Sequence, residues 1–134
     1  MKRKLIHNGS VLLITIFATA LLAAITIGIL QVNTEEIQLM RNQINAVEAQ
    51  ATAEAGLNDA FSELRLDSSW TTGFSSKAFN GGSYTVTVSG TLPDPTITST
   101  GTSAQGFVNR VEADITVGST SPYIIRIDSL RINE

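Results

Sequence analysis

An uncharged, mostly apolar run of 20 residues, from position 11 to position 30, is the strongest pattern in the chain. At the helical rise of about 1.5 Å per residue, such a run spans roughly 30 Å, the thickness of the hydrocarbon core of a bilayer. The pattern therefore predicts that residues 10–30 form a transmembrane helix. Small residues, which allow membrane helices to approach each other closely, recur in this run: Thr15, Ala18, Thr19, Ala20, Ala23, Ala24, Thr26 and Gly28.

The helical pattern continues through residues 31–66, which contain no proline and many strong helix formers. Apolar residues recur there at helical spacing in two stripes. The first stripe is Ile37, Met40, Ile44, Val47 and Ala51, and the second is Ala53, Leu57, Ala60, Phe61 and Leu64. We expect one continuous helix over residues 10–66, whose second half is amphipathic. The second stripe is expected to pack on the domain that follows, with Gly56 at a close contact, whereas the first stripe needs partner helices.

The composition changes at residue 67 to Ser, Thr, Gly and alternating β-branched residues, which is typical of a sheet. Strands are predicted at residues 83–90, 97–103, 106–118 and 123–132, with a bulge at Gly101. Residues 67–82 are predicted to be a loop whose aromatic side chains pack against the end of the helix. The expected fold class is α+β: a long N-terminal helix packed on a small antiparallel sheet of about four strands, formed by residues 67–134.

The charge distribution predicts a topology. Three basic residues, Lys2, Arg3 and Lys4, precede the apolar run, and no acidic residue occurs before Glu35. The positive-inside rule then places the N-terminus in the cytoplasm and the C-terminal domain outside. Without residues 1–9, 6 basic residues face 12 acidic ones, a net charge of −6 that argues against nucleic acid as a partner.

The sequence offers little catalytic chemistry. It has no cysteine and a single histidine, His7, so a Ser/His/Asp triad or a His-ligated metal site is not available to the outer domain. The carboxylate pairs Asp59/Glu63 and Glu112/Asp114 are better interpreted as solvated surface. Asp94, between two prolines, is a weak candidate for calcium. We therefore expect no enzymatic activity, no cofactor and no metal site.

Three features together resemble the type IV pilin and pseudopilin superfamily. A short basic leader ends in Gly9 directly before an apolar helix. The segment ATAEAGLNDAFSEL, residues 51–64, resembles the A-E-A-G-hydrophobic segment of minor pilins of the PilX type. The segment ITSTGTSAQGFVNRVEADI, residues 97–115, resembles the strand–Gly–strand segment of the same group, with Arg110 near its middle.

The resemblance implies that residues 1–9 are a leader cut by prepilin peptidase between Gly9 and Ser10, and that Ser10 becomes a methylated N-terminus. It implies assembly into a pilus or secretion pseudopilus with other pilin subunits, starting from an inner-membrane assembly platform. One departure indicates a minor, initiating role: the family usually has glutamate at the fifth mature position, and here Ile14 occupies it. A tip-type pseudopilin similarly lacks that group.

The main alternative is a monomeric, signal-anchored envelope domain that binds a partner protein. The two interpretations differ at the N-terminus, because the first predicts a mature chain that starts at Ser10 and the second an intact Met1.

Overall fold

The long helix predicted from the sequence is present as a single element. The computed structural model describes residues 6–133, in which α1 comprises Ile6–Leu66. It begins four residues before Ser10, since nothing in Ile6-His7-Asn8 breaks a helix and Gly9 only weakens one. Asn42 and the residues after it form one compact unit, and the chain up to Arg41 forms another.

The end of α1 agrees with the predicted boundary at Leu66, and Asp67 explains it. The Asp67 amide donates a final backbone hydrogen bond to the Glu63 carbonyl, at 2.8 Å. Its own carboxylate then accepts hydrogen bonds from the amide and hydroxyl of Ser69, at 2.9 and 2.6 Å. A side chain that bonds the backbone two residues ahead favours a turn over another helical turn.

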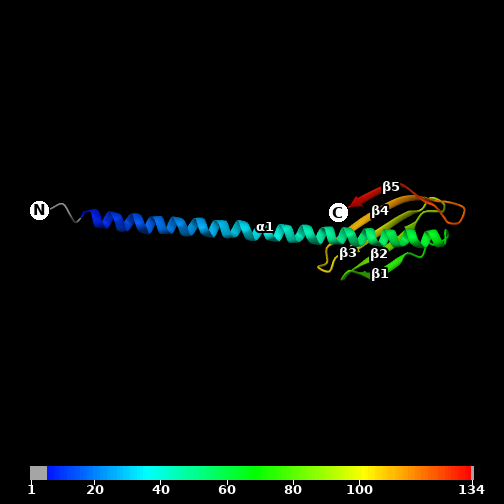
Figure 1. Ribbon diagram of the computed structural model, residues 1–134, viewed down its shortest axis with the longest axis horizontal. Helices are drawn as coiled ribbons and strands as arrows, with labels where there is room; N and C mark the ends of the chain where they lie inside the picture. Colours follow the sequence, from blue (N-terminus) through cyan, green and yellow to red (C-terminus); the bar gives the residue numbers. More distant parts are fainter. Residues whose placement is uncertain (1–5, 134) are drawn as a thin grey trace. The chain divides into compact units, whose positions relative to one another are not determined.

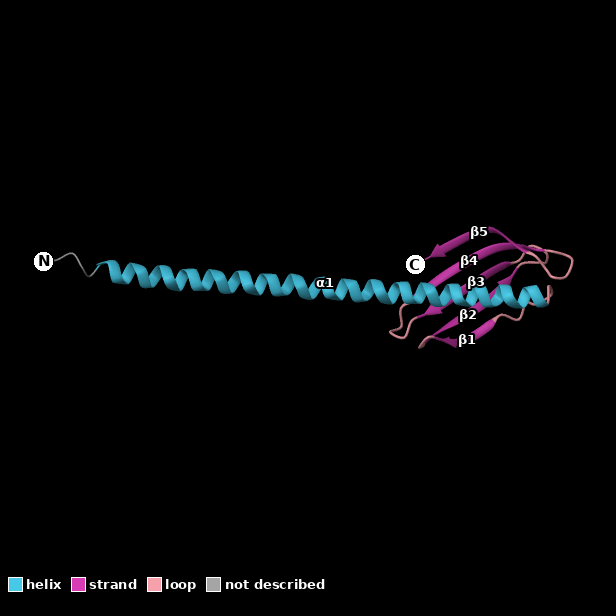
Figure 2. Ribbon diagram, viewed as in Figure 1, coloured by secondary structure: helices cyan, strands magenta, loops and turns pink. Residues whose placement is uncertain are grey.

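Five strands follow the helix and form one antiparallel sheet in the order β1-β2-β3-β4-β5 (Figure 1; Figure 2). Their bounds are Phe74–Phe79 for β1, Gly82–Ser89 for β2, Thr96–Thr102 for β3, Val108–Val117 for β4 and Ile125–Asn133 for β5. The α+β class, the helix on a sheet and the antiparallel meander are confirmed. The predicted number of about four strands is one too low.

The strand that was not predicted is β1, which lies in the segment expected to be a loop. Its residues do not alternate, and most of them are exposed. The sequence feature that indicates this strand is the turn that follows it. Phe79 pairs with Gly82, which leaves Asn80-Gly81 as a two-residue connection. Both residues have positive φ, 46° and 81°, and Asn-Gly is the pair that such hairpin turns favour.

The core lies between the C-terminal part of α1 and one face of the sheet. The second stripe of the helix is buried there, against alternate residues of β2, β3 and β4. The core side chains are Ala53, Leu57, Ala60, Phe61, Leu64, Tyr84, Val86, Ile97, Val111, Ala113, Ile115 and Val117. Trp70 and Phe74 pack against this core, with their ring centroids 5.2 Å apart.

Two glycines allow α1 to lie very close to the sheet. A Cβ on Gly56 would be 2.4 Å from the Ser99 hydroxyl oxygen, which bears out the predicted close contact. A Cβ on Gly101 would be 2.3 Å from the backbone of Ala49 and of Ala53. The bulge predicted at Gly101 is wrong, since β3 pairs there without interruption with both neighbours. Gly101 is needed instead because the helix backbone occupies the space of a side chain.

Candidate assembly surface

The N-terminal part of α1 is a membrane-length apolar segment. Within residues 6–133, one helix is long and apolar enough to cross a bilayer. Threonine hydroxyls in this segment donate hydrogen bonds to backbone carbonyls of the same helix. The Thr15 hydroxyl donates to the Leu12 carbonyl at 2.8 Å, and the Thr26 hydroxyl donates to the Ala23 carbonyl at 2.8 Å. These hydroxyls therefore do not need water, which suits a lipid environment.

The predicted processing site lies within α1. Gly9 and Ser10 are exposed and helical, and a Cβ on Gly9 would meet nothing within 4 Å apart from the surrounding helix backbone and its chain neighbours. Lys2, Arg3 and Lys4, on which the predicted topology rests, lie outside the described residues. Ile14, at the position where the family usually has glutamate, is an exposed apolar side chain.

The first apolar stripe is exposed along its whole length. Ile44 is 65% exposed and Val47 64%, and Ile37 and Met40 are exposed as well. At 100° per residue, Ile44 lies half a turn from Ala53, which is nine residues further along. Because Ala53 packs on the sheet, Ile44 and Val47 project from the side of the helix that the sheet cannot cover. The helix thus presents two apolar faces, and its own domain covers one of them.

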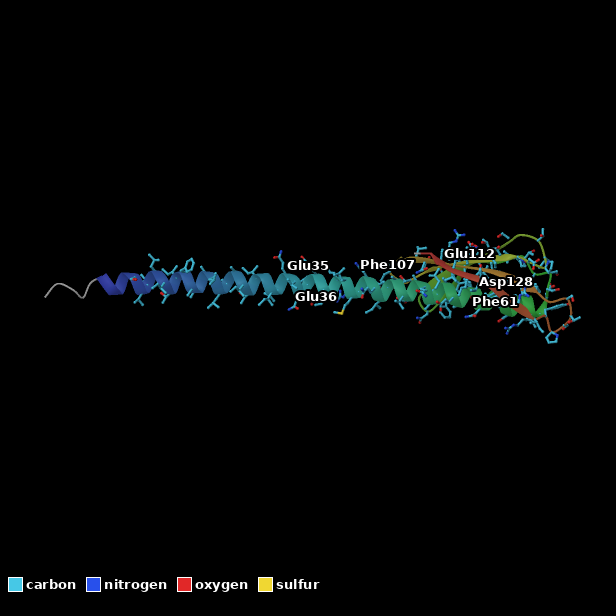
Figure 3. The ribbon with its side chains drawn as sticks, turned by 90° about the horizontal axis from the view of Figure 1, so that it is seen from above. Glu35, Glu36, Phe61, Phe107, Glu112 and Asp128 are labelled. Atoms are coloured by element: carbon cyan, nitrogen blue, oxygen red, sulfur yellow. The ribbon has the colours of Figure 1, made fainter. Side chains whose placement is uncertain are left out.

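The second stripe is organised differently. Leu57, Phe61 and Leu64, named from the sequence as packing residues, lie in the core, with Leu64 fully buried. Figure 3 shows Phe61 in the compact unit that begins at Asn42, whereas Glu35 and Glu36 project from α1 on different sides. The helix-packing residues named from the sequence are therefore a mixture of core residues and exposed residues.

A second exposed apolar surface, which the sequence did not reveal, lies on the edge strand β5. Ile127, Leu130 and Ile132 are 50%, 54% and 48% exposed. They pair with the buried β4 residues Ile115, Ala113 and Val111, so they share the face of the sheet on which α1 packs. We call these three residues the β5 shelf. They do not alternate strictly along the sequence, because a bulge at Asp128 separates Ile127 from Leu130 by three positions, and the sequence does not show the width of the sheet relative to the helix.

The opposite face of the sheet is polar and carries a charged network. Glu112 accepts hydrogen bonds from Arg110 and Arg131, both at 2.7 Å, and Arg131 also reaches Asp114 at 2.9 Å. The bond from Arg131 is the main reason why the pKa of Glu112 is lowered, while Ser129 and then Thr96 lower the pKa of Asp114. The acidic pair predicted to be solvated surface is only partly exposed, with 18% of the Glu112 side chain and 36% of the Asp114 side chain accessible, and both carboxylates are paired with arginine.

The same face continues to Asp128, which accepts hydrogen bonds from Thr116 and Arg126, both at 2.7 Å (Figure 3). The Thr116 hydroxyl also lies 2.9 Å from a carboxylate oxygen of Asp94, the weak calcium candidate, so Asp94 and Asp128 share its single proton. Among the described residues, no three His, Cys, Asp or Glu side chains come close enough together to hold a metal ion.

One polar cluster joins α1 to the first hairpin. Asp59 forms an ion pair with Lys77 of β1 and accepts a hydrogen bond from the Tyr84 hydroxyl at 2.7 Å. These two donors, Lys77 first, lower the pKa of Asp59. The three residues border an open depression of about 410 Å³. Asp59 thus links the hairpin to the helix.

These features define an α+β protein with one membrane-length N-terminal helix, whose exposed apolar surfaces are its most distinctive property. No family model, no curated protein and no solved structure matches the chain.

Proposed function

We propose that this protein is a structural subunit of a type IV pilus or a type II secretion pseudopilus, and a minor or initiating component of it. It would act by assembly through its N-terminal helix and not by catalysis. The observation that carries the proposal is the exposed stripe Ile37, Met40, Ile44 and Val47, which follows the membrane segment directly.

The stripe supports assembly because neither a bilayer nor the sheet covers it. Residues 10–30 already account for about 30 Å of hydrocarbon, so the stripe lies beyond a membrane of ordinary thickness. Exposed apolar patches that are continuous typically mark interaction sites. A bundle of such helices would cover both the stripe and, after extraction from lipid, the apolar segment before it.

Ile14 supports a place at or near the tip. In the family that the chain resembles, the glutamate expected there is thought to neutralise the N-terminal ammonium of a neighbouring subunit, because an unpaired charge in an apolar environment is costly. A subunit with no subunit above it would not need this carboxylate. The protein is then expected at low abundance, and equal abundance with the main subunit of purified filaments would exclude a tip position.

The proposed life cycle starts in the inner membrane as a single-pass protein, with the N-terminus in the cytoplasm and the C-terminal domain outside. Prepilin peptidase would cut between Gly9 and Ser10, and Ser10 would be methylated. The assembly platform would then move the subunit into an extracellular or periplasmic filament, next to other pilin or pseudopilin subunits. Neither nucleic acid nor a cofactor enters this cycle.

The N-terminus of the protein recovered from membranes tests the proposal. We expect a chain that starts at Ser10 when a prepilin peptidase is present, and an intact Met1 when it is absent. Gly9→Val should block processing, whereas Gly28→Val should not. The pair is matched because both glycines lie in α1, and a Cβ added at either position would meet nothing within 4 Å apart from the surrounding helix backbone and its chain neighbours.

An intact Met1 in the presence of an active peptidase would refute the pilin assignment. It would favour the alternative, a monomeric signal-anchored envelope domain that binds a partner.

A further inference from the structure

A heptad repeat runs along the side of α1 that carries the exposed stripe. Its a positions are Leu30, Ile37, Ile44 and Ala51, and its d positions are Asn33, Met40 and Val47. All of these residues are exposed, and all but Asn33 are apolar. An apolar a/d repeat over three heptads is the pattern of a helix that pairs with another helix in a coiled coil.

The repeat faces away from the sheet. In the compact unit that begins at Asn42, Ile44 lies half a turn from Ala53, which packs in the core. The next d and a positions after Ala51 are the exposed polar residues Glu54 and Asn58, so the apolar repeat stops there. A partner helix on this side can therefore approach the repeat without meeting the sheet.

The charges beside the repeat complement those of a second, parallel copy. Glu36 is a g position, and Arg41 is the e position of the following heptad. In a parallel, in-register pair of helices, side chains at these two positions meet across the seam, so Glu36 of each copy lies beside Arg41 of the other. Among residues 6–133, the ion pairs within the chain use neither Glu36 nor Arg41, so both charges are available.

Two further features favour a parallel pair of identical helices. Anchored copies of one chain enter a bilayer in the same direction, and the repeat continues into the membrane segment through Thr19, Ala23 and Thr26, which are small enough for close approach. The other feature is Asn33. Its amide lies opposite its own copy when the helices are in register, and a polar residue within an apolar seam specifies register.

We propose that this chain forms a parallel, two-stranded coiled coil with a second copy of itself through residues 30–51. The inference deepens the proposed function by naming a partner of the exposed stripe. It rests on that function only in that both copies are anchored in the same membrane.

The contact is isologous and closed, because the same surface of both copies is buried around a two-fold axis. It yields a pair and not a filament of this chain alone, in agreement with a minor component. Both copies start at the same level and neither lies above the other, so the pair can occupy a tip without a carboxylate at position 14. The rest of the circumference of the uncharged membrane segment remains for the subunits that follow.

Disulfide crosslinking of the full chain in membranes tests the pair. The sequence contains no cysteine, so an introduced thiol is unique. Two differently tagged copies that both carry Ile37→Cys should give a two-tag dimer in a glutathione redox buffer. Gln38→Cys, the exposed b position next to it, is the matched control and should give none.

A mixed sample tests the register. When one copy carries Ile37→Cys and the other Ile44→Cys, the two thiols are one heptad apart, about 10.5 Å along the axis. A disulfide needs Cβ atoms only about 3.5–4.5 Å apart, so the mixed sample should give little two-tag dimer.

Charge reversal provides a second readout. Glu36→Arg or Arg41→Glu alone places like charges side by side in both interhelical pairs, and the yield of the Ile37→Cys dimer should fall roughly fivefold, as expected for two exposed ion pairs. The combined variant restores opposite charges and should recover the yield. Glu35→Arg, an exposed f position on the far side of the helix, is the matched control and should leave the yield unchanged.

The outcomes separate this contact from the pilin assignment. The proposed pair would be overturned by the absence of a dimer, by an equal yield with Gln38→Cys or in the mixed sample, by failure of the combined variant to recover the yield, or by a product that joins the chain to a different protein. If the recovered chains nevertheless begin at Ser10 and filaments form, the proposed function stands without the pair. A specific dimer between chains that retain Met1 would support the pair and refute the pilin assignment.

Discussion

Gly101→Ala should destabilise the outer domain strongly, because the space for the added methyl group is occupied by helix backbone. The new Cβ would be 2.3 Å from the Ala49 carbonyl oxygen and from the Ala53 nitrogen, whereas ordinary contacts begin at 3.4 Å. The shortfall is therefore about 1.1 Å. Backbone atoms cannot rotate away as a side chain can, so α1 must move away from β3.

The cost follows from that displacement. A radial gap of about 0.5–1 Å forfeits a quarter to a half of the dispersion energy of each contact. Overpacking of a well-packed core typically costs about 1–3 kcal/mol or more, and we expect the upper end, about 3 kcal/mol. For a domain of this size, 3 kcal/mol corresponds to a fall in Tm of roughly 10–25 °C.

Fluorescence of Trp70 is the appropriate probe of this unfolding. It is the only tryptophan and it packs against the core, so its signal reports the outer domain and not the membrane helix. The measurement uses the full chain in detergent. Thr100→Ala, next to Gly101 on the opposite face of β3, is the control and should cost less than about 1 kcal/mol. A Tm for Gly101→Ala within the range of that control would refute the role assigned to the helix–sheet contact.

Three further predictions concern the same unfolding transition. Ser99→Ala should stabilise the domain by about 1 kcal/mol, because the buried Ser99 hydroxyl has no hydrogen-bond partner among the described residues; an unchanged or lower Tm would contradict this. Asp59→Asn should destabilise the domain by no more than about 1 kcal/mol, since the ion pair with Lys77 is partly exposed. If this loss of stability does not become smaller in high salt, the ion pair is not its source. The free energy of unfolding should be nearly constant from pH 7 to pH 5 and decrease below about pH 4.5, because the pKa values of Asp59, Glu112 and Asp114 are lowered in the folded state. Carboxylates of this kind stabilise the fold at pH values above their unfolded-state pKa. This stabilisation is lost as the pH falls through their folded-state pKa. A stability that rises on acidification would contradict that sign.

Periodicity was sufficient to predict the helix and four of the strands, and the change in composition at residue 67 predicted the end of the helix. Both signals are local: an uncharged run followed by apolar residues at helical spacing, and strict alternation in segments such as Tyr84–Val88. The strand β1 was missed because its side chains are mostly exposed, so burial imposes no alternation on it. The Asn80-Gly81 turn was its available signal.

The wrong bulge at Gly101 and the exposure of the β5 shelf, about which no prediction was made, have a different origin. A glycine within a strand pattern fits a bulge or a close approach of backbone equally well, and the choice depends on what lies above the strand. Similarly, the apolar residues of β5 have the pattern of a buried face. Whether they are covered depends on how many strands one helix can span, which no local pattern contains.

The two exposed apolar surfaces limit how the chain can exist outside a membrane. A monomeric anchored domain has no reason to keep Ile44 and Val47 on the side of α1 that its own sheet cannot reach, nor to leave the β5 shelf half exposed. Polar residues at these positions would preserve the fold, since neither surface contributes to the buried core. In the assembly that we propose, neighbouring subunits would cover surfaces of this kind. The apolar stripe and the β5 shelf therefore support the proposed assembly on physical grounds that do not depend on the family resemblance.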